Sequence, residues 1–100
     1  MLTLTNTMLN KSIIDANAEV RAFALTLGID YEQLQPGEKI VVPARWPNGE
    51  PTEIRFYRTA GKRSDRRVSI KELRKMAEVG DTITATASAK SGVLLQVVAA

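Results

Sequence analysis

Apolar residues recur along this 100-residue chain first at helical spacing and then at strand spacing. The stretch 15–27 has apolar side chains at intervals of three and four, which predicts a helix. We expect Ser12 or Asp15 to cap its start, and Gly28 stands where a left-handed residue would end it. Both boundaries of this helix are therefore marked in the sequence.

Apolar residues then recur at every second position in two stretches, 39–46 and 53–58. Alternation of this kind is typical of strands with one buried face. The intervening Asn48-Gly49 pair favours a tight hairpin turn, because both residues tolerate positive φ angles. In the second strand, Ile54 and Phe56 are predicted to share the buried face.

Polar and charged residues dominate the stretch 59–67, which we expect to be a solvated loop. A short helix is predicted after it, over 70–77. Ser69 followed three residues later by Glu72 forms a capping box for the start of that helix. Its positive dipole end would then point at the loop.

A second hairpin is predicted from the alternation in 82–87 and from the last apolar stretch, 93–98. Because 93–98 is apolar on both faces, we expect it to lie in the centre of a sheet or to be covered by another chain. The two hairpins share residues at a constant offset: Gly37-Glu38, Ile40, Ala44 and Gly49 match Gly80-Asp81, Ile83, Ala87 and Gly92. This match suggests a duplicated helix-hairpin unit.

The predicted fold class is α+β, a small β-barrel or pseudobarrel built from two hairpins and two helices. Residues 12–100 would form one domain, and residues 1–11 an N-terminal segment that could be flexible.

Composition excludes several function classes. The chain has no Cys and no His, which removes disulfides, thiolate sites and the commonest general base and metal ligand. No phosphate-loop or metal-spaced motif is present. We therefore predict a protein that is not an enzyme and that needs no cofactor, metal or small-molecule substrate. The chain shows no secretion signal and no apolar run of about 20 residues, so a cytoplasmic setting without a membrane partner is expected.

Charge is concentrated in one window. Between positions 55 and 75 the chain has nine of its fourteen bases and only two acids, whereas the remainder has five bases and nine acids. Such a cluster is typical of proteins that bind polyanions, because Lys and Arg that neutralise phosphates release condensed counterions. The candidate nucleic-acid-binding residues are Arg55, Tyr57, Arg58, Lys62, Arg63, Arg66, Arg67, Lys71, Arg74 and Lys75.

This window could instead be a solubilising loop followed by the wet face of a helix. The excess of Arg over Lys favours a binding role, since the planar guanidinium pairs bidentately with phosphate or with guanine. Arg55 and Tyr57 would lie on the strand face opposite the core, where Tyr57 could stack on a base. Trp46 could also stack but is expected in the core, and Ser69 could contact phosphate but is expected to act as a cap.

The stretch 67–83, RVSIKELRKMAEVGDTI, combines a short Leu-Arg helix with Gly-Asp and a strand. This order resembles the AbrB/MazE-type swapped-hairpin transcription factors and, more loosely, the B3-like pseudobarrels of plant regulators and restriction endonucleases. Both groups bind duplex DNA. In the B3-like group, strands and loops of the barrel form the DNA surface, which would suit Arg55, Arg58 and the loop from Lys62 to Arg67.

The sequence thus predicts a nucleic-acid-binding domain, with duplex DNA favoured, RNA or single-stranded DNA still open, and a regulatory role by association. The alternative is a protein-interaction or structural module that pairs through the apolar strand 93–98. A homodimer is compatible with both hypotheses.

Overall fold

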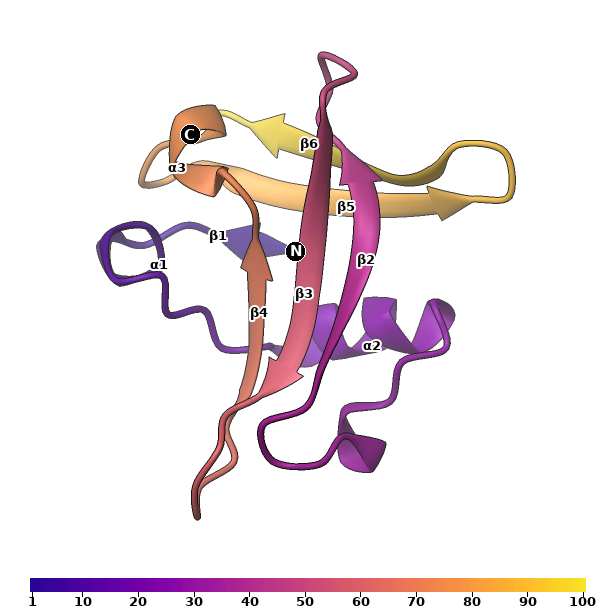
Figure 1. Ribbon diagram of the computed structural model, residues 1–100. Coiled ribbons are helices and arrows are strands. Elements are labelled where there is room, and N and C mark those ends of the chain that lie inside the picture. Colours follow the sequence, from indigo (N-terminus) through magenta and orange to yellow (C-terminus); the bar gives the residue numbers. More distant parts are fainter.

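The computed structural model describes residues 1–100 and contains six strands and four short helical segments (Figure 1). In chain order these are β1 (Leu2–Thr3), α1 (Asn6–Asn10), α2 (Ala18–Thr26), the 3-10 helix η1 (Tyr31–Gln33), β2 (Lys39–Arg45), β3 (Pro51–Arg58), β4 (Arg66–Ile70), α3 (Leu73–Met76), β5 (Thr82–Ser88) and β6 (Gly92–Val98).

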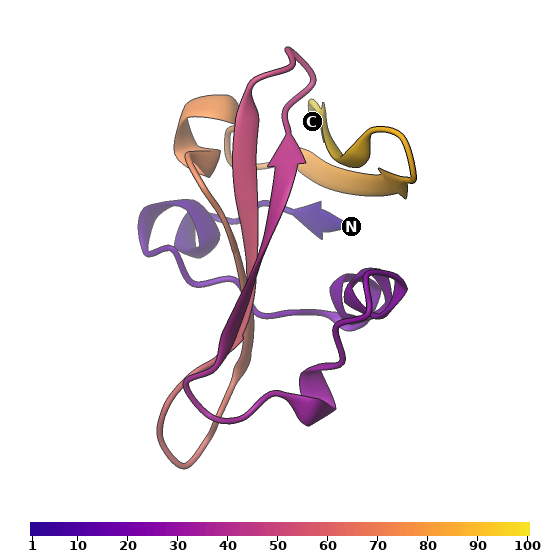
Figure 2. The same ribbon diagram turned by 45° about the vertical axis from the view of Figure 1, so that its right-hand side comes forward.

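The strands form one curled sheet in the order β1-β5-β6-β2-β3-β4. Both predicted hairpins, β2–β3 and β5–β6, are present and antiparallel. They are joined by a short parallel contact in which Ala44 pairs with Val93 and Arg45 with Leu94. Because that contact is so short, the β5–β6 hairpin runs crosswise to β2–β3–β4 and the sheet becomes a half-barrel (Figures 1 and 2). The α+β class is confirmed, and β6 is central between β5 and β2 as its apolar faces predicted.

The alternating patterns place side chains as expected. Ile54 and Phe56 of β3 are buried, whereas Arg55 between them is exposed. The Asn48-Gly49 turn closes with hydrogen bonds between Trp46 and the residues that follow it, and Gly49 has a φ of 88°. Trp46 is 2% exposed and belongs to the core.

The core fills the inside of the curled sheet. Val20 and Ala24 of α2, together with Leu9 of α1, pack into it against the strands. Residues 1–11 were predicted to be a separate N-terminal segment. They contribute β1, α1 and the fully buried Leu2 to the fold. None of the helices combines the length and the apolar character that crossing a membrane requires.

The start of α2 differs from the prediction. Asn17, not Ser12 or Asp15, is the N-cap, and its side chain accepts a hydrogen bond from the Val20 N–H. The preceding residues are extended because they pair with the outer edge of β4: the Ala16 N–H donates to the Arg66 carbonyl. Asp15 lies opposite Arg67 in that pairing.

The region around β4 also corrects the prediction. Arg66 and Arg67 belong to a strand, so the loop spans only 59–65. Ser69 lies within β4 opposite Arg55, and it caps no helix. The residue before α3 is Glu72, in a left-handed conformation with a φ of 62° and no side-chain cap. Pairing of Val68 and Ile70 with β3 buries both side chains, and that burial outweighs the local capping-box signal.

Candidate nucleic-acid interface

The basic window is divided between the two ends of β4. In Figure 1 the 59–65 loop extends from the lower end of β3 and β4, while α3 follows β4 at the upper end. Between these ends, β2, β3 and β4 present an outer face that points away from the core. The ten candidate residues therefore occupy different environments and are considered in turn.

The outer face is ordered by the strand register. Lys39 pairs with Tyr57, and Tyr57 pairs with Arg67, so these three side chains form one row across the sheet. The next row contains Arg55 and Ser69. Because side chains on one face of neighbouring strands lie within reach of each other, cations, an aromatic ring and a hydroxyl are brought together.

A recess of about 410 Å³ opens on this face. We call it the basic recess, and its lining contains three cationic side chains, one tyrosine and two serines but no acid. Its residues are Ser12, Lys39, Arg55, Tyr57, Ser69, Ile70 and Lys71. Three cations around a recess that no carboxylate lines create a positive potential that attracts anions.

Lys71 is held in place through its backbone. Its N–H donates to the Glu53 carbonyl, and its carbonyl accepts a 2.8 Å hydrogen bond from the Thr52 hydroxyl. Thr52 is the one buried polar residue of the protein, and this bond satisfies its hydroxyl. These two hydrogen bonds to β3 therefore fix the backbone of Lys71 at the rim of the basic recess.

One acid stands beside the basic recess without lining it. A carboxylate oxygen of Glu53 lies 3.8 Å from the guanidinium of Arg55, and both side chains are close to half exposed. An exposed pair at this distance contributes little energy, so Arg55 keeps most of its capacity to bind another anion.

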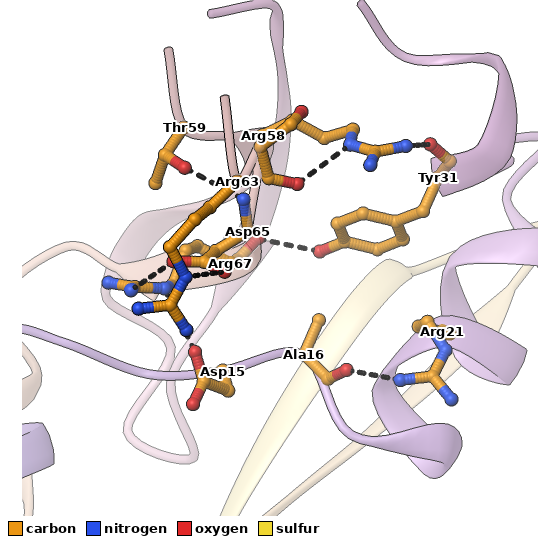
Figure 3. A network of polar contacts seen from close by, with 10 residues as sticks. Asp15, Ala16, Arg21, Tyr31, Arg58, Thr59, Arg63, Asp65 and Arg67 are labelled. Carbon is orange, nitrogen blue, oxygen red and sulfur yellow. Dashed lines mark hydrogen bonds and ion pairs between the residues drawn. The ribbon is translucent and has the colours of Figure 1, made fainter. Parts of the chain in front are cut away.

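A second group of cations surrounds the loop end. We call it the arginine cluster: Arg21, Arg58, Arg63, Arg66 and Arg67, which line a polar recess together with Asp15, Ala16, Ser64 and Asp65. Figure 3 shows the polar contacts of most of these residues. Arg67 forms ion pairs with Asp15 at 2.9 Å and with Asp65 at 3.1 Å, and its side chain is only 19% exposed.

Arg58 and Tyr31 strengthen this network. Arg58 donates to the carbonyls of Ser64 and Tyr31, both at 3.1 Å, which ties the 59–65 loop to η1 (Figure 3). The Tyr31 hydroxyl donates to the Arg67 carbonyl at 2.7 Å. Burial, with a smaller contribution from Tyr57, raises the pKa of Tyr31 well above its ordinary range, so the hydroxyl keeps its proton and remains a donor.

The remaining candidates are more exposed. Arg66 pairs with Glu32 of η1 at 3.0 Å. Arg63 is 88% exposed and approaches Asp65 only to 3.6 Å, and Lys62 is exposed beside it in the loop. Arg74 and Lys75 line a recess on the other side of Ser69, next to α1 and α3.

The structure thus brings Arg55, Tyr57 and Lys71 to one recess, whereas the charged groups of Arg58, Arg66 and Arg67 bind other parts of the protein. Sequence reasoning missed Lys39 and Ser12. Alternation in β2 could have placed Lys39 on the outer face, but a two-residue turn at Asn48-Gly49 would have put Ile40 opposite Tyr57, so only the observed register pairs Lys39 with Tyr57. Ser12 left no local signal, because only the path of the chain beside β4 brings it to the recess.

The arrangement can bind anions by charge and by hydroxyl hydrogen bonds. No three acidic side chains gather closely enough to hold a metal ion. Comparisons with protein-family models, curated proteins and solved structures find no match for this chain. The resemblance to swapped-hairpin and B3-like DNA-binding folds accordingly stays a prediction.

Proposed function

We propose that this protein binds nucleic acid through the outer face of β2, β3 and β4, with the basic recess at the centre of the interface. The observation that supports this most is that Lys39, Arg55 and Lys71 line one recess without an acidic residue. Phosphate oxygens are the polyanion groups best matched to guanidinium, ammonium and serine hydroxyl donors at such short range.

The shape of the face supports the same proposal. Cations continue from the basic recess toward α3, because Arg74 and Lys75 follow Lys71 in the chain and line the adjoining recess. A continuous series of cations can follow a phosphate backbone, and Tyr57 offers a ring for base stacking. A protein made merely soluble by these charges would not need them around one recess.

A double substitution tests the proposal. We expect Arg55→Ala with Lys71→Ala to weaken binding of labelled DNA or RNA by about tenfold or more at low salt. The negative slope of log K, where K is the association constant, against log salt concentration should become shallower by about 1 for each lost phosphate contact. Fluorescence anisotropy titrations of duplex DNA, single-stranded DNA and RNA at two salt concentrations give both quantities.

The matched control is Arg45→Ala with Lys90→Ala, which removes the same charge from exposed positions outside the recess. Equal weakening in the control would mean that only net charge matters and would overturn the proposed site. Absence of binding to all three nucleic acids at low salt would overturn the function itself.

A second candidate function rests on β6. Its pairing with β2 stops at Leu94, so the β2-facing edge of residues 95–98 has no strand partner, and Val98 is 54% exposed. An open apolar strand edge can pair with another chain, including a second copy of this one. Val98→Lys should then lower the oligomeric mass measured by sedimentation, whereas an unchanged mass would exclude this edge as the interface.

We also propose, as a finer description of the fold, that the half-barrel is related to DNA-binding pseudobarrels and derives from a duplicated helix-hairpin unit. A glycine with positive φ stands at a similar place in each hairpin, Gly49 within the first turn and Gly92 directly after the second. The sequence favoured duplex DNA and left single-stranded DNA and RNA open, and the titrations above rank the three ligands. A regulatory role and a cytoplasmic site of action belong to the same hypothesis.

A further inference from the structure

The basic recess has an apolar neighbour. A second recess of about 250 Å³ lies between α1, β4 and α3, and we call it the apolar recess. Its hydrophobic lining is Met8, Leu9, Ile14, Ile70 and Leu73. Ser12, Ser69 and Ile70 line both recesses, so the two adjoin each other.

The backbone at this junction is held in an unusual conformation. Ser12 and Glu72 have φ angles of 55° and 62°, in the left-handed region that non-glycine residues rarely adopt. Both line the apolar recess, and Ser12 also lines the basic one. Backbone strain of this kind persists where the surroundings impose it, and it concentrates at ligand sites.

The two recesses together match the two halves of a nucleotide. A nucleobase is a flat, largely apolar group with polar edges, and it is joined through the sugar to a charged phosphate. The apolar recess offers apolar walls with hydroxyls at its border and Arg74 and Lys75 in its lining, while Arg55 and Lys71 line the neighbouring anionic site. An acidic peptide would satisfy the charges but would not need hydroxyls beside an apolar recess.

Resting on the proposed function, we propose that the apolar recess takes an unpaired base of a single-stranded nucleic acid while the basic recess holds the adjoining phosphates. A base within a duplex is stacked and paired on both sides and presents only its edge in a groove. Only an unpaired or extruded base can enter a recess of this kind. Tyr57, in the lining of the basic recess, then stacks on the neighbouring base.

Oligonucleotides of one length and sequence test this with the wild-type protein. We expect single-stranded DNA or RNA to bind about tenfold more tightly than the duplex, and a strand with abasic sites to lose about tenfold in affinity at constant charge. Comparing DNA with RNA identifies the preferred sugar. Equal binding of single strand and duplex, or of abasic and intact strands, would overturn the base site while leaving phosphate binding established.

A substitution in the apolar recess gives an independent result. Met8→Lys adds a positive charge, so purely electrostatic binding would become tighter, whereas a base in the recess predicts weaker binding of intact single strands. Met8→Leu is the matched control and should bind as the wild type does, and thermal unfolding checks that both variants fold. Displacement of the strand by polyglutamate as readily as by unlabelled strand would overturn the proposal, and lack of binding to any nucleic acid would instead refute the proposed function.

Discussion

In the basic recess, Arg55 and Lys71 face a space with no acid in its lining, whereas in the arginine cluster Arg67 lies between two carboxylates at 2.9 and 3.1 Å. The side chains are of the same type and lie at neighbouring positions of one sheet. Their difference comes from what the chain places opposite them. A cation already paired with a carboxylate has few counterions to release to a phosphate, so its charge serves the fold.

The same comparison explains why counting bases in the sequence overstates the interface. Glu32 and Asp15 come from segments far from the basic window, and they neutralise Arg66 and Arg67. Arg55 has only the 3.8 Å contact with Glu53. The comparison predicts that substitutions in the cluster change stability and that substitutions in the recess change binding.

The largest effect on stability is expected for Arg67→Ala. The substitution leaves Asp65, which is 26% exposed, without its closer partner and removes the 2.9 Å ion pair with Asp15. We expect a loss of about 2 kcal/mol in unfolding free energy, less than for a fully buried pair because solvent screens part of the interaction. Urea denaturation measures it.

Arg63→Ala is the control within the same cluster, because Arg63 is 88% exposed and should cost less than about 0.5 kcal/mol. Nucleic-acid affinity of folded Arg67→Ala protein should stay near the wild-type value. A strong loss of affinity without a loss of stability would place Arg67 in the interface and break the distinction between the two regions.

A smaller effect is expected for Tyr31→Phe, which removes the hydrogen bond to the Arg67 carbonyl. Near neutral pH the variant should lose about 1 kcal/mol of stability. Because the pKa of Tyr31 is raised in the folded state, the unfolded chain loses this proton first as pH rises above about 10.

Wild-type stability should therefore fall by an additional 1.4 kcal/mol or so per pH unit above pH 10, and this part of the fall should be missing in Tyr31→Phe. Denaturant unfolding at pH 7, 9 and 10.5 tests the sign. The stability advantage of the wild type over Tyr31→Phe should therefore shrink above pH 10. An advantage that instead grows would contradict a buried, protonated Tyr31.

The smallest effect is expected for Glu53→Gln, which removes the acid beside Arg55. Nucleic-acid affinity should rise by about twofold at low salt, since a weak exposed pair gives up a few tenths of a kcal/mol. Glu50→Gln makes the same charge change in the exposed β2–β3 turn and should leave affinity unchanged. If both variants gain equally, the basic recess has no local electrostatic advantage over the rest of the surface.

Sequence patterns predicted the two hairpins well because alternation is a local property of the strand pleat. Ile54 and Phe56 are buried and Arg55 is exposed for that reason alone. The same reasoning failed for β4, where charged Arg66 and Arg67 resemble a loop. That stretch is a strand because β3 pairs with one edge and residues near Asp15 pair with the other, and neither partner is visible locally.

The sequence by itself determined which side chains of β3 face outward, and with them Arg55 and Tyr57 of the basic recess. Only the tertiary structure decided which cations remain unpaired, and only it brought Ser12 and Lys39 to the recess. The physical reason is the distance along the chain over which each effect acts. Strand periodicity acts over neighbouring residues, whereas ion pairing depends on through-space distances between segments that the fold alone brings together.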